Sequence, residues 1–201
     1  MILYNDNEMV VCIKEKGVLS QQGKPGQKSM IDILAAELGS EIYPVHRLDK
    51  EVSGVMVYAK TKVAAADLSV QVSSREMEKH YIATTQKSTL ELEGTMEDLL
   101  YFDKCKNKSF VVKKERKGVK KAILEYKEIS SDGDRSHFWV RLLTGRTHQI
   151  RVQFASRKHP LVGDRKYGSK IDGDIGLVSC FIGFRHPTNG EWLEFKHPDY
   201  K

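Results

Sequence analysis

The chain has 201 residues, 40% of them hydrophobic, and its 33 Lys and Arg against 27 Asp and Glu give a net charge of +6. This length suits one domain with a sizeable core and is too short for two full ones, so we expect a single domain over residues 1–201. No apolar run approaches the roughly 20 residues that span a bilayer, and the first residues lack a signal-peptide pattern, which predicts a cytoplasmic protein without membrane attachment. The basic surplus favours a phosphate-rich partner without identifying one.

The three cysteines, Cys12, Cys105 and Cys180, lie far apart in the sequence and are odd in number. No CxxC pair occurs, so neither a disulfide framework nor a zinc ribbon is indicated. We expect reduced thiols that fill space as small hydrophobic side chains.

Apolar patterning predicts regular elements in the first part of the chain. Residues 9–13 (MVVCI) have the composition of a strand, and residues 29–38 show helical spacing that ends at Gly39. Residues 53–60 (SGVMVYAK) again favour a strand. Thr61 can cap a following helix, which we expect to run to about residue 78.

The second part begins with strand character at residues 80–84 and then becomes less regular, with a markedly basic stretch at residues 104–121. Two hairpins and a short helix are predicted after it. Their ranges are strands 122–129 and 137–143 around a turn at 131–134, a helix at 147–156, and strands 181–185 and 191–195 around a turn at 187–190. The sum predicts an α+β fold, a mixed, largely antiparallel sheet flanked by helices.

Asp49 stands in a polar, charge-dense segment, YPVHRLDKEVSG, just before an apolar strand. Such an acid is either a surface turn residue or helix cap, or a reactive group. The second interpretation has a physical basis in the basic neighbours His46, Arg47 and Lys50, because positive charge keeps a carboxylate ionised, as a nucleophile requires.

A second dense segment, LTGRTHQIRVQFASRKHPLVGDRKY, covers residues 143–167. Its residues 144–148 have the chemistry of a helix start, where free N–H groups attract anions. On the helix that follows, Arg146, His148 and Arg151 would border one face at the rim of a cleft, while Ile150 and Phe154 face the core. An ordinary solvated basic face is the alternative.

Metal binding has little support in the sequence. His148 and His159 could act as ligands, but no partner cluster with metal-site spacing accompanies them. We therefore expect no metal.

The two segments together resemble a known family, the RluA-type pseudouridine synthases. HRLDKEVSGVMVYAKT resembles the family's HRLDxxTSGxxxxAK motif, and LTGRTHQIRVQFASRKHPLVGDRKYG resembles TGRxHQIRxH followed by HPxxGDxxYG. KHYIA at residues 79–83 and HPTNGE at residues 186–191 resemble the family's KxYxA and HPxTGE segments, in the same order. The resemblance implies a pseudouridine synthase fold with an RNA-binding catalytic cleft. It also implies an isomerase that converts specific uridines of structured RNA to pseudouridine without a cofactor.

The chain departs from the family pattern at a few places. Val52 replaces a usual Thr, Gln153 replaces the second His after Arg151, KEKG at residues 14–17 stands for KPxG, and Val178 occupies a common His position. We also expect the chain to be a short form, the catalytic domain alone, without the N-terminal RNA-binding module of longer relatives.

The resemblance implies a role for each motif residue. Asp49 would initiate the reaction with Arg151 as its ionic partner, and Tyr81 would stack on the base and take the C5 proton. Arg47 would help to fill the gap left by the flipped base. The remaining residues expected to bind substrate are His46, Arg146, Thr147, His148 and Gln149. The expected partner is ribosomal RNA, transfer RNA or both, and the expected state is a monomer.

Two other functions stay open from the sequence. One is a catalytically silent RNA-binding relative that uses the same cleft. The other is a metal-dependent hydrolase built on His46, Asp49 and His148. The basic stretch at residues 104–121 has its own two interpretations, a surface along the RNA backbone or a solvated loop.

Overall fold

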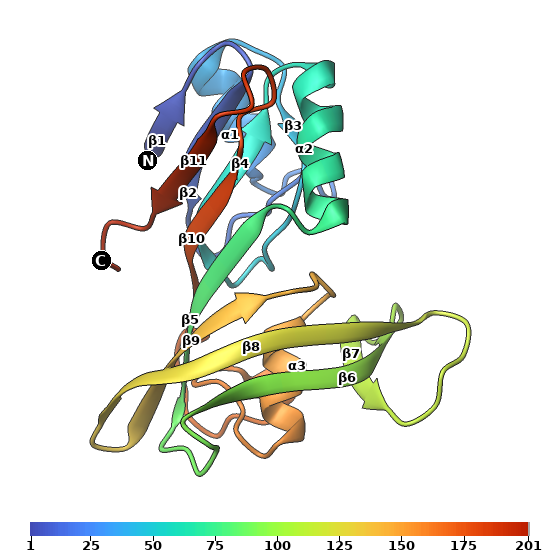
Figure 1. Ribbon diagram of the computed structural model, residues 1–201, viewed down its shortest axis with the longest axis vertical. Coiled ribbons are helices and arrows are strands. Elements are labelled where there is room, and N and C mark those ends of the chain that lie inside the picture. The colour runs from blue at the N-terminus through green and yellow to red at the C-terminus, as the bar shows by residue number, and fades with distance from the viewer. Residues whose placement is uncertain (201) are drawn as a thin grey trace. The chain divides into compact units, whose positions relative to one another are not determined.

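The computed structural model describes residues 1–200, and the chain divides into two compact units. The first unit combines residues 1–79 with the residues from 179 onward, and the second unit is residues 80–178. Each unit contains both antiparallel strands and helices (Figure 1).

The first unit is built on an antiparallel sheet whose central strands are buried on both faces. Strand β2 pairs with β4 from Met9 opposite Ala59 to Lys14 opposite Gly54. The strands lie in the order β1, β2, β4, β10, with β3 at one end of β4 and β11 beside β10. Their bounds are Ile2–Asn5 (β1), Met9–Lys14 (β2), Tyr43–Pro44 (β3), Ser53–Ala59 (β4), Leu177–Arg185 (β10) and Trp192–Lys196 (β11).

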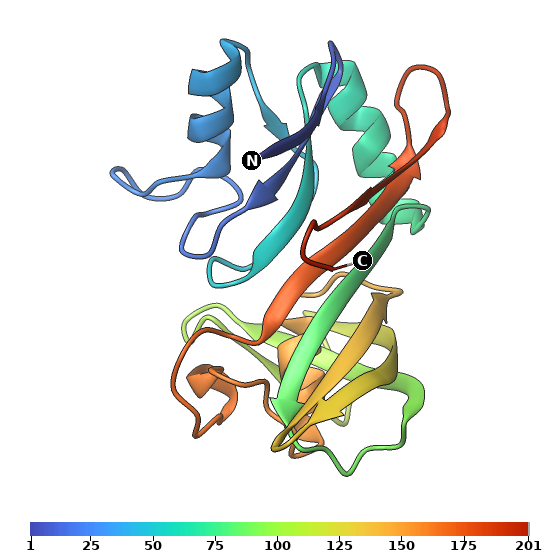
Figure 2. The same ribbon diagram turned by 90° about the vertical axis from the view of Figure 1, so that its left-hand side faces the viewer.

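Helices α1 (Met30–Leu38) and α2 (Lys62–Ser74) lie on opposite sides of this sheet (Figure 2). Alternate residues of β2 and β4 form the core that receives α2, because successive side chains of a strand point to opposite faces. The buried members of this core are Met9, Val11, Ile13, Val55, Val57, Ala59, Ala64, Leu68, Met77, Ile182 and Phe184.

The predicted stop at Gly39 and the predicted cap at Thr61 are confirmed, and Ser29 proves to be the cap of α1. The Ser29 side chain accepts from the Asp32 N–H, and Gly39 ends α1 with a left-handed φ of 61°. Thr61 caps α2 as predicted, with its side chain accepting from the Ala64 N–H.

Helix α2 ends at Ser74, four residues before the predicted end. Arg75 takes a left-handed φ of 68°, and the N–H groups of Glu76 and Met77 both donate to the Gln71 carbonyl. This turn places Met77 in the core. No Gly or Pro marks it, so the sequence carries no signal for the stop.

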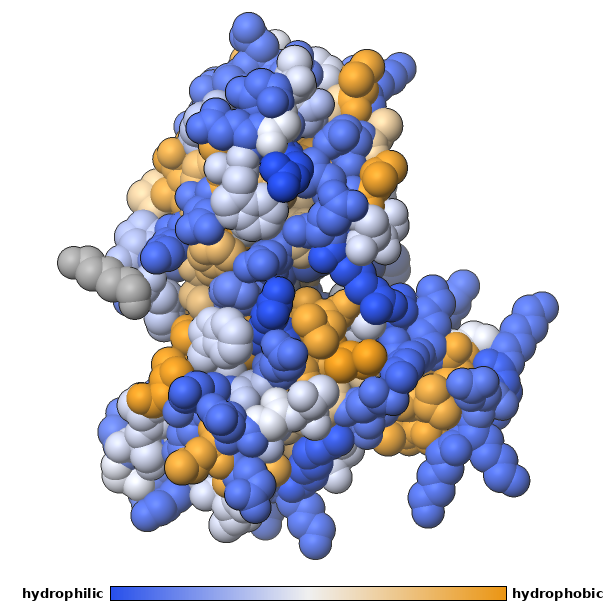
Figure 3. Space-filling view, in the orientation of Figure 1, coloured by the Kyte–Doolittle hydropathy of each residue, from blue (hydrophilic) through white to orange (hydrophobic). Residues whose placement is uncertain are grey.

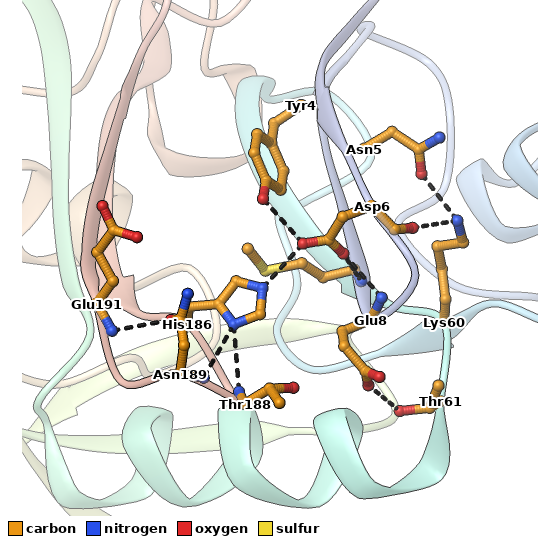
Figure 4. A network of polar contacts seen from close by, with 11 residues as sticks. Tyr4, Asn5, Asp6, Glu8, Lys60, Thr61, His186, Thr188, Asn189 and Glu191 are labelled. Carbon is orange, nitrogen blue, oxygen red and sulfur yellow. Dashed lines mark hydrogen bonds and ion pairs between the residues drawn. The ribbon is translucent and has the colours of Figure 1, made fainter.

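A polar network joins the β1–β2 turn to the β10–β11 hairpin of the first unit (Figure 4). The Asp6 carboxylate accepts from the N–H groups of Glu8 and Met9 and from the Tyr4 hydroxyl, and it pairs with His186 Nε2 at 2.8 Å. Burial acts to raise the pKa of Asp6, but these hydrogen bonds outweigh it and lower the pKa. The predicted tail hairpin is thus confirmed, and its HPTNGE turn is fixed through His186.

The second unit is an antiparallel sheet in the order β5, β9, β8, β6, β7. The strands are β5 (Glu78–Gln86), β6 (Glu93–Asp103), β7 (Lys108–Val112), β8 (Val119–Asp132) and β9 (Arg135–Leu142). Helix α3 (Gln149–Ser156) packs on this sheet, where the rings of Tyr126, Phe138 and Phe154 lie 5.3–6.0 Å apart. A short 3-10 helix, Arg165–Tyr167, follows.

The fold class is confirmed as α+β with a largely antiparallel sheet, and so is the β8–β9 hairpin. The prediction of an irregular middle was wrong, because β6 and β7 are regular strands and β8 begins at Val119. Acidic residues interrupt the apolar pattern of β6. The structure explains them, since Glu93 and Glu97 form ion pairs with Lys127 and Lys121 of the neighbouring β8.

Within residues 1–200, no helix combines the length and the apolar character needed to cross a membrane. All three cysteines are free thiols, with Cys12 and Cys180 buried and Cys105 exposed.

Gly54 offers a test of the packing of the first unit. Its φ is 130°, and a Cβ there would overlap the Ser179 carbonyl oxygen and lie 2.6 Å from the Ser179 nitrogen. We expect Gly54→Ala to lower the free energy of unfolding by about 3 kcal/mol or more, measured by urea denaturation. Gly26→Ala is the control, because Gly26 also has a positive φ but open space around it, and we expect a loss of about 1 kcal/mol. Equal losses would show that the close approach of Gly54 and Ser179 is unimportant.

Candidate active site

Asp49 begins a β-turn in the first unit, between β3 and β4. The Val52 N–H donates to the Asp49 carbonyl at 3.0 Å, which closes the turn over residues 49–52, called here the Asp49 turn. Asp49 is half-buried, whereas Leu48 before it and Val52 at the end of the turn are buried in the core. The carboxylate therefore stands on a turn whose two ends are anchored by apolar side chains.

Ser20 holds the residue before Asp49. Its hydroxyl donates to the Leu48 carbonyl at 2.8 Å and accepts from the Leu48 N–H at 2.9 Å. The Tyr58 hydroxyl in turn donates to the Ser20 carbonyl at 2.8 Å. A single buried side chain thus satisfies both backbone groups of Leu48, which lies outside any strand pairing.

Lys14 holds the residue after Asp49. Its side chain is fully buried, and Nζ donates to the carbonyls of Glu15, Val18 and Lys50 at 3.0, 2.9 and 3.2 Å. The Gly17 N–H also donates to the Lys50 carbonyl, at 2.9 Å. Three acceptors match the three donors of an ammonium group, so the buried charge is fully hydrogen-bonded.

The carboxylates nearby act on the charge of Lys14. Burial lowers the pKa of Lys14 to about 8, and the negative charges of Glu51, Asp49 and Glu15 oppose that shift. Lys14 therefore holds the Asp49 turn through a hydrogen bond to its backbone, and the carboxylates of the turn favour its charged form.

His46 is neutral, in contrast to the expectation that it supplies positive charge to Asp49. Its Nε2 accepts from the Val57 N–H at 3.2 Å, so the proton of the neutral ring is on Nδ1. Burial and, to a smaller extent, the positive charge of Lys79 lower the pKa of His46 to about 3. Nδ1 is buried and has no hydrogen-bond partner among residues 1–200. The cations that flank Asp49 in the sequence are Arg47 and Lys50, both exposed.

Arg151 of the second unit forms a buried ion pair with Asp164. Its Nε and Nη2 donate to the two carboxylate oxygens at 2.6 and 2.9 Å, and the two side chains are 5% and 1% exposed. The guanidinium also lies 5.2 Å from the centre of the Tyr167 ring. Arg151 is thus fixed in the interior of the unit rather than on an open rim.

Asp164 is a residue that sequence reasoning did not select. The signal for Asp164 is the GD of HPLVGDRKYG, but this motif alone does not indicate a role for its acid. The pairing of Arg151 with Asp49, implied by the family resemblance, stays a prediction.

His148, directly before α3, is buried. Its Nδ1 lies 2.9 Å from the Tyr167 hydroxyl, which accepts from the Ser109 N–H and donates to the Ser109 carbonyl. Because the single hydroxyl proton goes to Ser109, we infer that Nδ1 carries the hydrogen shared with Tyr167.

Gln149 fixes the turn that leads into α3. Its Oε1 accepts from the Thr144 hydroxyl at 2.8 Å and from the Arg146 N–H at 3.0 Å, and its Nε2 donates to the Ile123 carbonyl. These contacts give Gln149 a structural role. The Thr147 carbonyl accepts from the Ser109 hydroxyl.

Two further predicted site residues, Arg146 and Tyr81, lie in the second unit. Arg146 is half-buried and its Nε donates to the Lys121 carbonyl at 3.0 Å. Tyr81 lies on β5 opposite Val140 of β9 and is 6% exposed. Ile150 and Phe154 are buried, as predicted.

The structure gives no support to a metal centre. Residues 1–200 contain no group of three His, Cys, Asp or Glu side chains placed to hold an ion. His159, considered above as a ligand, lies 3.3 Å from the Thr89 hydroxyl through Nε2.

Comparison with known proteins gives consistent matches. A family model described as RNA pseudouridylate synthase matches residues 8–156. An uncharacterized RNA pseudouridine synthase of Aquifex aeolicus is 34% identical over 97% of this chain and 68% of that protein. Ribosomal large subunit pseudouridine synthase D of Xylella fastidiosa is 35% identical over 98% of this chain and 62% of that protein. The dual-specificity RNA pseudouridine synthase RluA of Salmonella typhimurium is 31% identical over 98% of this chain and 92% of that protein.

Two solved structures share the fold. Human RNA Pseudouridylate Synthase Domain Containing 4 matches with a TM-score of 0.81 at 24% identity, covering 98% of this chain and 87% of that one. Human RNA Pseudouridylate Synthase Domain Containing 1 matches with a TM-score of 0.81 at 22% identity, covering 98% of this chain and 82% of that one. The chain spans 58–68% of the length of several curated relatives that it matches.

The hydrogen bonds of Ser20 lead to a stability prediction. Ser20→Ala leaves the Leu48 N–H and carbonyl without their side-chain partner, so we expect the free energy of unfolding to fall by about 1–3 kcal/mol. Ser40→Ala is the matched control, because the buried Ser40 hydroxyl has no partner among the described residues. We expect a change within about 0.5 kcal/mol there. Equal effects in urea denaturation would contradict the role of Ser20.

The neutral state of His46 leads to a pH prediction. The folded protein keeps the ring neutral down to about pH 3, whereas the unfolded chain protonates it near pH 6.5. Its stabilising contribution is therefore complete above pH 6.5 and is lost as the pH falls from there towards 3. We expect the stability of the wild type relative to His46→Asn, which does not titrate, to fall by about 2 kcal/mol from pH 7 to pH 5.

Urea denaturation at the two pH values measures this difference. NMR of the imidazole nitrogens adds a direct reading, with a neutral ring protonated at Nδ1 expected at pH 5. A ring that titrates near pH 6.5 would contradict the assignment.

Proposed function

Because the chain belongs to the RNA pseudouridylate synthase family, we propose that it isomerises specific uridines of structured RNA to pseudouridine. The observation that carries this proposal is the family match over residues 8–156, which includes Asp49, Tyr81 and Arg151. The fixed backbone on both sides of Asp49 supports it, since a nucleophile must be held in a defined place.

The reaction is an isomerisation whose atoms balance within the RNA. The bond between C1′ of the ribose and N1 of the base breaks, and a bond between C1′ and C5 forms. The proton on C5 leaves and N1 is protonated. No electrons are exchanged with another molecule, so the chemistry requires a nucleophile, a base and precise positioning.

We assign the first step to the Asp49 carboxylate. Ser20 and Lys14 hold the backbone groups of Leu48 and Lys50, so the residue between them has little freedom to move. A carboxylate that is already positioned loses less conformational entropy when it meets the substrate. Glu51 lies in the same turn and is exposed, which makes it a natural comparison.

Tyr81 and Arg151 take the supporting roles in this proposal. Tyrosine offers an aromatic face for the base and a phenol that can receive the C5 proton. Arg151 is held by Asp164, so its orientation is set before substrate arrives. Arg47 is long, cationic and exposed, which suits a residue that fills the space of a flipped base.

The class of RNA is the part with least support. One relative is named as a ribosomal large subunit enzyme and another as a dual-specificity enzyme. We therefore propose ribosomal RNA, transfer RNA or both as the substrate. A cytoplasmic location, a monomeric state and the working of both units as one catalytic domain stay predictions.

Asp49→Asn tests the proposed nucleophile. The amide keeps the shape but lacks the negative charge, so we expect tritium release from RNA containing 5-tritiated uridine to fall by about a thousandfold or more. RNA binding and the unfolding transition should stay close to those of the wild type. Glu51→Gln removes a carboxylate from the same turn and should keep activity within about threefold. Near-normal turnover by Asp49→Asn would exclude Asp49 as the nucleophile.

A further inference from the structure

The net positive charge of the protein comes from one short segment of the second unit. Residues 104–121 contain nine Lys and Arg and one Glu. The rest of the chain has 24 basic and 26 acidic residues, a net charge of −2. The whole basic surplus of the protein therefore belongs to these 18 residues, called here the basic arm.

The basic arm consists of the β6–β7 turn, strand β7, the β7–β8 loop and the first residues of β8. Hydrophilic side chains project where the β7–β8 loop ends this sheet (Figure 3). Four lysines of the loop and of β8 are exposed, namely Lys113, Lys114, Lys117 and Lys120. Like charges this close repel one another, and folding alone does not require them.

Acidic residues pair with Lys121, the last residue of the arm, and with Lys127 beyond it, but not with the lysines of the β7–β8 loop. Glu97 pairs with Lys121 at 2.6 Å, and Glu93 pairs with Lys127 at 3.3 Å. Among residues 1–200, the four lysines named above form no ion pair. These four lysines thus keep their charge for an external partner.

Aromatic rings lie among these cations. The Arg116 guanidinium stacks 4.7 Å from the centre of the Tyr101 ring, and Lys106 and Lys108 lie 5.8 and 5.7 Å from that of Phe110. Both rings are half-buried. Such contacts hold a cation in place while its charge stays available. Cations interleaved with aromatic rings are typical of surfaces that bind nucleic acids.

The arm also adjoins the segment that contains the proposed substrate-binding residues. Arg146 Nε donates to the carbonyl of Lys121, the last residue of the arm. A polyanion that contacts Arg146 can therefore continue along the arm within the same unit.

We propose that the basic arm binds the phosphate backbone of the substrate RNA outside the reacting uridine. This inference rests on the proposed function for the identity of the RNA. Phosphate contacts give affinity and orientation without reading sequence. The arm therefore contributes to RNA affinity and leaves the chemical step unchanged.

The test replaces Lys113, Lys114, Lys117 and Lys120 by Ser in one variant. The control replaces four exposed lysines outside the arm by Ser, namely Lys62, Lys87, Lys127 and Lys196. Both variants therefore lose the same charge. Binding to in vitro transcribed large-subunit ribosomal RNA is measured from 50 to 300 mM salt. We expect the arm variant to reduce the slope of log affinity against log salt by about 3, and the control by less than about 1.

Tritium release gives the second reading. In the arm variant KM should rise about tenfold or more while kcat changes less than about twofold. Equal losses of RNA affinity in both variants would show that only the net charge of the protein matters, and would overturn the proposal. Unchanged RNA binding, with lost binding to phosphatidylserine vesicles, would also overturn it and make the arm a membrane-binding surface. Because RNA binding is scored separately, a wild type without isomerase activity would contradict the proposed function and leave the result for the arm readable.

Discussion

The buried ammonium of Lys14 is the interaction on which the proposed active site depends. Removing an ammonium group from water is costly, and the cost is offset only if every donor finds an acceptor. Here the three acceptors are backbone carbonyls, one of them that of Lys50 in the Asp49 turn. Together with the Ser20 hydroxyl on Leu48, this contact gives the turn the fixed hydrogen bonds that a strand would otherwise supply.

The same principle operates in the second unit. Arg151 is held by the two oxygens of Asp164, and His148 by the Tyr167 hydroxyl, all in buried surroundings. The basic arm is the opposite case, since four of its lysines, Lys113, Lys114, Lys117 and Lys120, are exposed and form no ion pair within the described chain. Buried polar contacts thus fix the residues assigned to chemistry, while exposed charge serves a large and variable polyanion.

The sequence predicted what local patterns determine. These patterns predicted the cap Thr61, the helix stop at Gly39, the antiparallel hairpins and the α+β class, and the family motifs selected Asp49 and Arg151. They missed contacts between distant segments, because nothing local marks Ser20 as the partner of Leu48 or Asp164 as that of Arg151. The sequence also led to a positive charge on His46. That expectation was wrong because burial keeps the ring neutral, and burial is a property of the fold that the motif does not reveal.

The central claim is that buried hydrogen bonds fix the backbone on both sides of Asp49. Backbone amide hydrogen exchange at Leu48 tests this claim most directly. Leu48 lies in a loop, and its N–H is bonded only to a side chain, the Ser20 hydroxyl. If that contact holds the Asp49 turn, the Leu48 amide should exchange about as slowly as the amides in the centre of β4. Exchange at the rate of an unprotected loop amide would show that the backbone before Asp49 is not fixed, and would contradict the account.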